Sequence, residues 1–279
     1  MILNTNQIAD YKKNGYIIIK DFFPKVTIDT LFKEIKEVFA LQIQHHLGIS
    51  PEKSLALDQQ GFSDLLYELY NKDSSVFSNC GKQVQHLVEL HELGLSKKLM
   101  EVLKELGLSK PILSVRPCVL MNNVKLDKKG AQGNYWRKPS HQDWYYSQGS
   151  LDSVTVWTPY IFCDKELGIL EFIPGSHLWG LQKTEKSNYG ELVQEPADSQ
   201  FESYDMGPGD IIIFVSLLIH RSGVNSTNRV RWSTQFRFNN LLEPTFIDRK
   251  FPNPFIYHSL DVLETPDFPK EEDLKKQFQ

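Results

Sequence analysis

Two histidines and one aspartate are the residues of this sequence with the clearest capacity for chemistry. His141 and Asp143 flank Gln142, and His220 ends an apolar run much further along the chain. In an extended strand, residues two apart point to the same face, so His141 and Asp143 are expected to share one face. If a later antiparallel strand brings His220 beside them, the three side chains form a ligand set that suits Fe(II) and leaves coordination positions open.

The segment after His220 strengthens this interpretation. A His-x-Asp tripeptide alone is weak evidence, because His141 could equally be an ordinary loop histidine. Here, however, Arg231 follows His220 inside another strand-like run, and Ser222 lies between them. A guanidinium binds a carboxylate with two parallel hydrogen bonds, and a serine hydroxyl can donate a third. These residues are suited to hold the far carboxylate of a 2-oxo diacid.

Several motifs in the region from about 110 to 240 resemble those of the phytanoyl-CoA dioxygenase family, and they occur in the same order. They are His141-Gln-Asp143, Trp157 in Val-Thr-Val-Trp-Thr-Pro, the turn Ile173-Pro-Gly-Ser-His177, the strand from Gly209 to His220, and Arg231. The resemblance implies an enzyme that depends on Fe(II) and 2-oxoglutarate and is built on a double-stranded β-helix.

The same resemblance assigns roles to individual residues. It implies His141, Asp143 and His220 as the iron ligands, and Arg231 and Ser222 as the site for 2-oxoglutarate. Trp157 would border that pocket, and Asn123 would be a further co-substrate contact. Succinate and CO2 would be the co-products. Because relatives that halogenate lack the carboxylate ligand, Asp143 favours hydroxylation.

The sequence pattern predicts a mainly β protein with flanking helices. We expect a jelly roll of cupin-like form, with strands at 15–20, 112–124, 136–146, 153–162, 169–173, 211–215 and 230–238. Helical spacing predicts helices at 5–14, after Pro24, in 51–110 and at 271–278, the N-terminal ones packing outside the sheet. We expect a single oxygenase domain over 1–279, with a helix-rich part (1–110), a β-helix core (111–240) and a wrapping C-terminal tail (241–279).

The composition of the chain indicates which kinds of partner molecule and which compartment to expect. The chain has 31 basic and 35 acidic residues, a net charge of −4 and no basic tail, so no nucleic-acid partner is expected. Its three cysteines are scattered and are expected to be reduced. The first residues lack the pattern of a signal peptide, and no apolar run is long enough to cross a membrane. We therefore expect a cytoplasmic protein without a membrane partner, and nothing in the sequence indicates an oligomeric state.

The remaining histidines are poor ligand candidates. His177 lies near the expected pocket in sequence, but the Pro-Gly-Ser turn before it favours a role in the turn. The pairs His45–His46 and His86–His91 have spacings that do not place two imidazoles on one helix face. We expect these four to be surface or core residues.

The substrate is the least defined part of the prediction. Dioxygen and a small polar or anionic metabolite are expected, especially if Arg137 or Lys138 faces inward; Tyr145, Tyr146, Trp136 and Trp179 could also reach the pocket. A CoA thioester is disfavoured because no basic patch for its phosphates is evident. The long polar segment 178–204 is expected to be a lid. Two alternatives stay open: a non-catalytic β-barrel that binds a small molecule, and a cupin-type metalloenzyme.

Overall fold

The N-terminal third of the protein is helical apart from one strand. The computed structural model describes residues 2–123, 125, 137–185, 190–255 and 267–278. A capping box between Asn4 and Gln7 begins the first helix, because each side chain hydrogen-bonds the other residue's backbone N–H. The elements are α1 (Thr5–Asn14), β1 (Tyr16–Ile19), α2 (Lys25–Leu47), α3 (Pro51–Leu55), α4 (Gln59–Lys72), α5 (Ser74–Gln83), η1 (Val84–His86), α6 (Val88–Gly94) and α7 (Lys97–Glu105).

The central feature is an antiparallel sheet of six strands. Its order is β1, β6, β4, β8 and β2, and β3 also pairs with β8. The register aligns Tyr16 with Phe214, Trp157 with Ile212 and Gln235, and Asn122 with Arg231. Beyond β1, its strands are β2 (Pro111–Leu113), β3 (Cys118–Asn122), β4 (Val154–Pro159), β6 (Ile211–Val215) and β8 (Arg231–Asn240).

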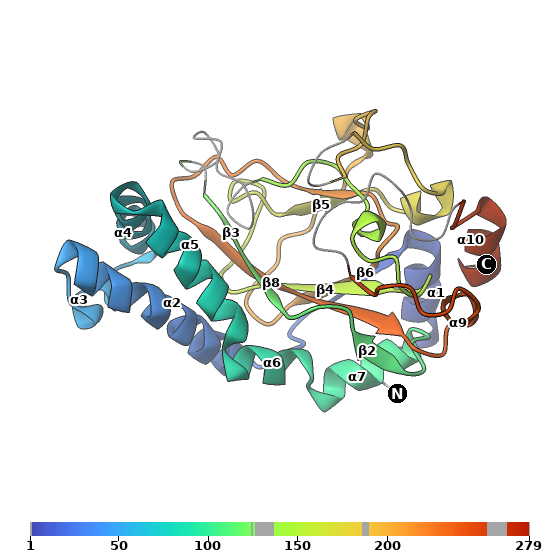
Figure 1. The fold of residues 1–279 in the computed structure, drawn as a ribbon, viewed down its shortest axis with the longest axis horizontal. Helices are drawn as coiled ribbons and strands as arrows, with labels where there is room; N and C mark the ends of the chain where they lie inside the picture. The colour runs from blue at the N-terminus through green and yellow to red at the C-terminus, as the bar shows by residue number, and fades with distance from the viewer. Residues whose placement is uncertain (1, 124, 126–136, 186–189, 256–266, 279) are drawn as a thin grey trace.

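A second, smaller antiparallel sheet pairs β5 (Leu170–Phe172) with β7 (His220–Ser222). Isolated bridges extend it, joining His141 to His220 and Phe172 to Glu202. Side chains from both sheets line one cavity, so the cavity lies between them. Figure 1 shows β5 on one side of the large sheet and the helices α2 to α7 along its other margin. Among the described residues the strands do not close into a barrel.

The helices cover the large sheet through aromatic contacts. Phe32 and Phe39 of α2 lie edge-on to Trp232 of β8, with ring centroids 5.5 and 5.7 Å apart. Gly94, at the end of α6, lies against Phe236, where a Cβ atom would come within 2.3 Å of the ring. Because residues alternate along a strand, the opposite face of β8 is free to line the cavity.

The C-terminal part returns to the end of the fold that carries α1. It contains α9 (Pro244–Asp248) and α10 (Glu271–Phe278), and Figure 1 shows both at the same end as the N-terminus. Phe278 of α10 packs edge-on against His177, which lies in η3 (Ser176–Trp179). None of the described helices combines the length and the apolar character that a membrane crossing requires.

Most expected elements are present, with three corrections. The helices 5–14 and 271–278 and the strand 211–215 form as predicted. The single strand expected over 112–124 is two strands, β2 and β3, separated by a segment that contains Pro117, which has no N–H for a ladder. The prediction of a strand over 136–146 is wrong for the described residues of that range. There, His141 makes only isolated bridges, and the 3₁₀ helix η2 (Asp143–Tyr145) follows. The tail expected to be extended contains α9, and residues 256–266 lie outside the described part.

A matched pair of glycines allows the junction between α1 and η3 to be tested. Gly15 and Gly48 both end helices with positive φ, 81° and 72°. A Cβ on Gly48 would meet nothing within 4 Å, whereas on Gly15 it would lie 2.5 Å from Nδ1 of the buried His177. We predict that Gly48→Ala lowers the free energy of unfolding by about 1 kcal/mol, because alanine is disfavoured at this positive φ even where its Cβ meets no neighbour. Gly15→Ala is expected to cost roughly 1–3 kcal/mol more through overpacking, as measured by urea denaturation. Equal losses in the two variants would contradict this contact.

Candidate metal and co-substrate site

The two candidate histidines are brought together by main-chain pairing. The N–H of His141 donates to the carbonyl of His220 at 3.0 Å, and the N–H of His220 donates back at 3.1 Å. Their rings lie with centroids 4.2 Å apart. Asp143 Oδ1 lies 3.6 Å from Nε2 of His141 and 3.8 Å from Nε2 of His220. In the part of the chain that the structure describes, these three buried residues are the group whose ligand atoms converge, all within 4.8 Å of one another.

Both imidazoles are oriented by main-chain carbonyls. Nδ1 of His141 donates to the carbonyl of Pro139 at 2.7 Å, and Nδ1 of His220 donates to that of Leu218 at 2.9 Å. With Nδ1 protonated, the neutral ring carries its lone pair on Nε2, the atom that faces Asp143. Burial, which outweighs the opposite effect of the Asp143 carboxylate, lowers the pKa of His220 to about 3, so His220 is neutral near pH 7. A neutral ring with a free Nε2 lone pair is the form that binds a metal.

Asp143 is held on its other side by two residues of the large sheet. Its Oδ2 accepts a hydrogen bond from the Thr155 hydroxyl at 2.6 Å and lies 3.4 Å from Nε of Arg237. Thr155 and Arg237 are direct partners in the β4–β8 register. Burial acts to raise the pKa of Asp143, but the Arg237 guanidinium and the two histidines hold it well below its usual range. The carboxylate is therefore ionised, with Oδ2 occupied and Oδ1 turned to the histidines.

The donor set fits a divalent iron ion. Two Nε2 lone pairs and one carboxylate oxygen converge from one side, which is the two-histidine, one-carboxylate arrangement of non-haem Fe(II) sites. The protein holds each donor through a second hydrogen bond, as metal ligands require for a fixed orientation. His141, Asp143 and His220 are thus the residues that would hold the metal.

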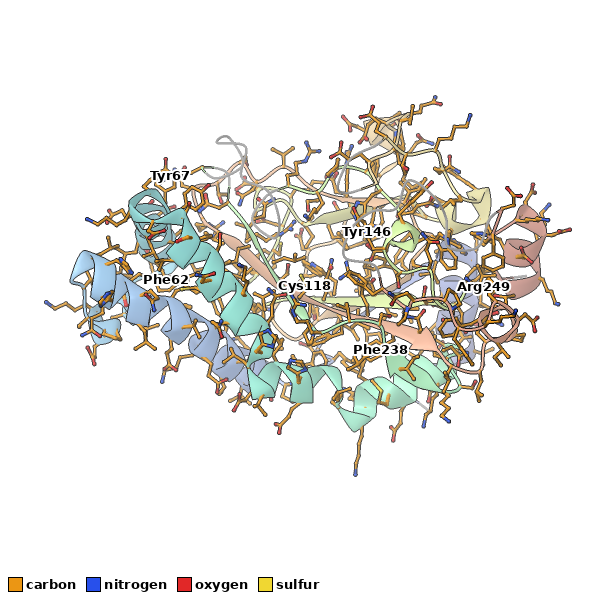
Figure 2. All side chains as sticks on the ribbon, in the orientation of Figure 1. Phe62, Tyr67, Cys118, Tyr146, Phe238 and Arg249 are labelled. Carbon is orange, nitrogen blue, oxygen red and sulfur yellow. The ribbon has the colours of Figure 1, made fainter. Side chains whose placement is uncertain are left out.

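Asp143 reaches this position by a different route from the expected one. It begins the 3₁₀ helix η2 instead of continuing a strand, and its backbone turns after Gln142. The turn also changes which tyrosine reaches the site. Tyr145, which the sequence analysis considered able to reach the pocket, instead donates its hydroxyl to the carbonyl of Gln182 at 2.6 Å. Tyr146 lines the cavity, and Figure 2 labels it together with Cys118 of β3, another lining residue.

Arg231 lies at the wall of the same cavity, which has a volume of about 230 Å³. Its guanidinium is buried and donates to Ser222 Oγ at 3.3 Å and to the carbonyl of Gly168. Its Nε has no hydrogen-bond partner among the described residues. Burial lowers the pKa of Arg231, because the charged guanidinium has lost hydrating water. A carboxylate bound here would compensate the buried charge in place of that water. Trp157 is fully buried and lines the cavity with Arg231 and Ser222.

The structure does not bring Asn123 into the cavity lining. Its Oδ1 accepts from the backbone N–H of Lys125 at 2.9 Å. Because side chains alternate, Asn122 is the residue on the face of β3 shared by Cys118 and Leu120, and it pairs directly with Arg231. Asn122 is buried, and its Nδ2 finds no partner among the described residues. Asn122, like Asn123, is not among the described residues of the cavity lining, although it lies on the β3 face that the lining residues Cys118 and Leu120 share.

Other residues considered as ligands or cations lie elsewhere. His177 Nε2 donates to the carbonyl of Lys12 at the end of α1, in keeping with a structural role. His91 contacts the carbonyl of Gln85, and His45 lies edge-on to His46 at the end of α2. None of these histidines belongs to the converging ligand group that His141, Asp143 and His220 form among the described residues. Trp179 is 48% exposed, and Trp136 lies outside the described residues.

Segment 178–204 packs along the same side of the site. Leu192 donates its N–H to the carbonyl of Ser140, and Gln182 donates its N–H to Oε1 of Gln142. Glu195 accepts from the Ser140 hydroxyl at 2.6 Å. The described residues of the segment are thus hydrogen-bonded to both neighbours of His141. Its closure over substrate stays a prediction.

Thr155 and Arg237, which hold Asp143, are two site residues that the sequence analysis missed. Both could have been found from alternation, since Thr155 lies two residues before Trp157 and Arg237 lies an even number of residues after Arg231. Residues at such spacing share a face of their strand. Once Trp157 and Arg231 were placed at the pocket, the same rule would have placed Thr155 and Arg237 there.

An antiparallel jelly roll with this donor set and a buried arginine defines a 2-oxoglutarate-dependent oxygenase. The family model for phytanoyl-CoA dioxygenase (PhyH) matches residues 11–233. The chain belongs to this family, and it is a 2-oxoglutarate-dependent dioxygenase whose cofactors are Fe(II) and 2-oxoglutarate. This confirms the family resemblance and sets aside the alternative of a non-catalytic binding protein.

Curated relatives and solved structures agree with the family assignment. The chain is 25% identical over 249 residues to the peroxisomal phytanoyl-CoA dioxygenase of Bos taurus, covering 85% of this chain and 68% of the relative. Among solved structures, the epimerase SnoN in complex with Fe³⁺, alpha ketoglutarate and nogalamycin RO aligns with a TM-score of 0.57 at 17% identity, covering 84% of this chain and 82% of SnoN. EctD from S. alaskensis with bound Fe aligns with a TM-score of 0.52 at 14% identity, covering 86% and 78%. These likenesses confirm the expected jelly-roll fold.

The hydrogen bond from Thr155 to Asp143 can be tested through metal affinity. We predict that Thr155→Val lowers Fe(II) affinity about 10–100-fold, because Asp143 loses the donor that fixes its orientation. Thr158→Val is the matched control. Thr158 is also fully buried on β4 but lies on the opposite face, and its hydroxyl bonds no described residue. Anaerobic Fe(II) titration of both variants measures the difference, and equal affinities would remove Thr155 from the site.

Proposed function

We propose that the protein hydroxylates a small anionic metabolite, with succinate and CO2 as co-products. The observation that carries the substrate proposal is the cavity beside His141, Asp143 and His220. Its volume of about 230 Å³ lies below the range of roughly 300–1,000 Å³ typical of ligand pockets. The co-substrate must share this space, so the proposed substrate is smaller than a CoA thioester.

The charge of the cavity wall supports an anionic substrate. Asp143 is the single carboxylate among the described residues of the lining, and several cationic side chains accompany it. Lys138 belongs to this lining, as the sequence analysis considered. Arg137 does not, because its Nε donates to the carbonyl of Ser222 and its side chain borders a second hollow.

The outcome of oxidation is part of the proposal. Asp143 supplies a carboxylate donor, which supports hydroxylation over halogenation.

The curated relatives include peroxisomal enzymes, so the cytoplasmic location expected from the sequence stays a prediction.

Different residues of the site would bind the metal and orient the co-substrate. Fe(II) supplies the activation of dioxygen and the oxidation of 2-oxoglutarate when it is bound. His141, Asp143 and His220 would hold the ion on one side and leave its other side open to the cavity. Arg231 and Ser222 would bind the far carboxylate of 2-oxoglutarate, which fixes the direction of the co-substrate. Trp157 and Leu170 contribute apolar surface that limits water in the cavity.

The activity is tested by succinate formation across a panel of small anionic and neutral metabolites, with Fe(II) and 2-oxoglutarate present. We expect His141→Ala and His220→Ala to lose most bound iron and all substrate-dependent succinate, because each removes one of the two imidazole donors. Far-ultraviolet circular dichroism serves as the control for folding. Unchanged iron stoichiometry in both variants would overturn the assignment of these ligands.

The co-substrate site makes a separate prediction. Arg231→Lys keeps a cation but loses the planar fork that matches a carboxylate. We expect the variant to require about tenfold or more 2-oxoglutarate for half-maximal turnover, in line with loss of about 1.5–3 kcal/mol for a charged hydrogen bond. Iron binding should be retained.

Two other cations near this region serve as controls. Arg229 donates to Gln59, and Lys125 lies 2.7 Å from Asp64, so both are occupied outside the cavity. Arg229→Lys should leave the 2-oxoglutarate requirement as in the parent protein. An unchanged requirement in Arg231→Lys would mean that another residue binds the diacid.

A further inference from the structure

The small sheet that carries the two histidine ligands is bordered on both sides by one segment of the chain. Bridges join His141 to β7 on one side and to Glu191 on the other, and β7 in turn pairs with β5. Beyond β5, Phe172 and Glu202 exchange two main-chain hydrogen bonds, at 3.0 and 2.9 Å. Residues 190–204 therefore leave the sheet beside His141 and return to it beside β5. We call these residues the strap.

Between these two edges the strap meets Arg221, the middle residue of β7. Nε of Arg221 donates to Glu171 of β5 at 2.7 Å. From the strap, Glu195 accepts from Nη1 at 3.2 Å, and Asp198 lies 2.8 Å from Nη2. The guanidinium also lies over the ring of Phe201, with Cζ 3.8 Å from the ring centroid. All four partners line the second hollow and not the cavity, so the strap holds Arg221 from the side of the sheet away from the metal site.

One carboxylate oxygen of Glu195 connects the two chain segments that carry the histidine ligands. This atom, Oε1, accepts from the Ser140 hydroxyl at 2.6 Å and from Nη1 of Arg221 at 3.2 Å. Ser140 directly precedes His141, and Arg221 directly follows His220. The two histidines already exchange main-chain hydrogen bonds with each other. Glu195 therefore adds a side-chain link across the same pair of segments, from outside the cavity.

The burial of these groups indicates which contact of the strap matters most. Ser140 is fully buried, and the side chain of Arg221 is 8% exposed, so a partner removed from either leaves a buried donor unpaired. The side chain of Asp198 is 90% exposed, and solvent screens an ion pair of this kind. Glu195 is half-exposed, but its Oε1 meets both buried donors. Glu195 is therefore the strap residue best placed to act on the histidine segments.

We propose that Glu195 is a positioning residue through which the strap holds His141 and His220 in the arrangement that binds the metal. This role does not depend on which substrate the enzyme oxidises, so it goes beyond the proposed function. Fixing the two histidine segments costs conformational entropy, and a docked strap has already fixed them before the metal binds. Docking of the strap and occupancy of the metal site are therefore linked, and each favours the other by the same factor.

The first test measures Fe(II) affinity by anaerobic titration of the full chain. We expect Glu195→Ala to bind Fe(II) about tenfold more weakly, near the lower end of the effect that loss of an outer partner has on a metal site. Asp198→Ala is the matched control, because it removes a carboxylate from the same strap and the same guanidinium but leaves the contact with Ser140. The control should bind Fe(II) within about twofold of the parent protein. Parent-like affinity in Glu195→Ala, or equal losses in the two variants, would overturn the role of Glu195.

A conservative variant and a double mutant separate positioning from general destabilisation. Glu195→Gln keeps an oxygen that can accept from both Ser140 and Arg221, so it should recover most of the Fe(II) affinity. Ser140→Ala removes one of the two bonds from the other side and should weaken Fe(II) binding in the same direction. Added to Glu195→Ala, it should have little further effect, because the bond is already lost. Fully additive losses in the double mutant would mean that Glu195 does not act through Ser140 and would overturn the proposal.

The linkage also predicts a signal in the strap itself, which hydrogen–deuterium exchange measures without any substrate. The N–H groups of Leu192 and Glu202 donate to the carbonyls of Ser140 and Phe172, so their exchange reports undocking of the strap. We expect anaerobic Fe(II) to slow exchange across 190–204 in the parent protein by about the factor that Glu195→Ala loses in Fe(II) affinity. In Glu195→Ala, Fe(II) should leave this exchange nearly unchanged. Exchange in the parent strap that does not respond to Fe(II) would overturn the linkage, even if the metal binds.

Discussion

The pair of main-chain hydrogen bonds between His141 and His220 is the contact on which the site depends. It joins two residues far apart in sequence and brings their Nε2 atoms to the same carboxylate oxygen. Each imidazole is then oriented by a carbonyl two residues earlier in its own chain segment. The geometry of the donors therefore comes from the backbone, and only the carboxylate needs side chains of the large sheet to orient it.

The two ends of β8 in the large sheet carry residues with different roles. Near one end, Arg231 is suited to bind the co-substrate together with Ser222 of β7. Near the other end, Arg237, the register partner of Thr155, contacts Asp143 directly. The opposite face of the strand packs on the helices through Trp232 and Phe236. One strand thus connects the stability of the core to the spacing between the two ends of the cavity.

Residue types and alternation were enough to predict much of this arrangement. The apolar run before His220, the guanidinium at Arg231 and the helical spacing after Pro24 all depend on local patterns, and the structure contains the corresponding elements. Asp143 shows where local reasoning fails. Its place in η2 depends on a turn that the composition of Trp144 to Tyr146, rich in residues typical of strands, did not indicate.

Other parts of the site depend on long-range pairing, which a single sequence does not contain. The contact of Arg237 with Asp143 requires the register of β4 against β8, and the pairing of Asn122 with Arg231 follows from the register of β3 against β8. The described residues of segment 178–204 show no periodicity of their own, and their hydrogen-bond partners, such as Ser140 and Gln142, are distant in sequence. Their order comes from those partners and not from any periodicity of their own.

Because the two faces of β8 have different roles, the strand also limits where residues can be inserted or deleted. One residue inserted between Trp232 and Phe236 would exchange the faces beyond it, so that Arg237 would enter the helix-facing layer and Phe238 would enter the cavity. Core packing and metal orientation would fail together. Insertions and deletions compatible with folding are therefore confined to the connections between strands, where the shape of the cavity mouth can diverge while the donor atoms keep their positions.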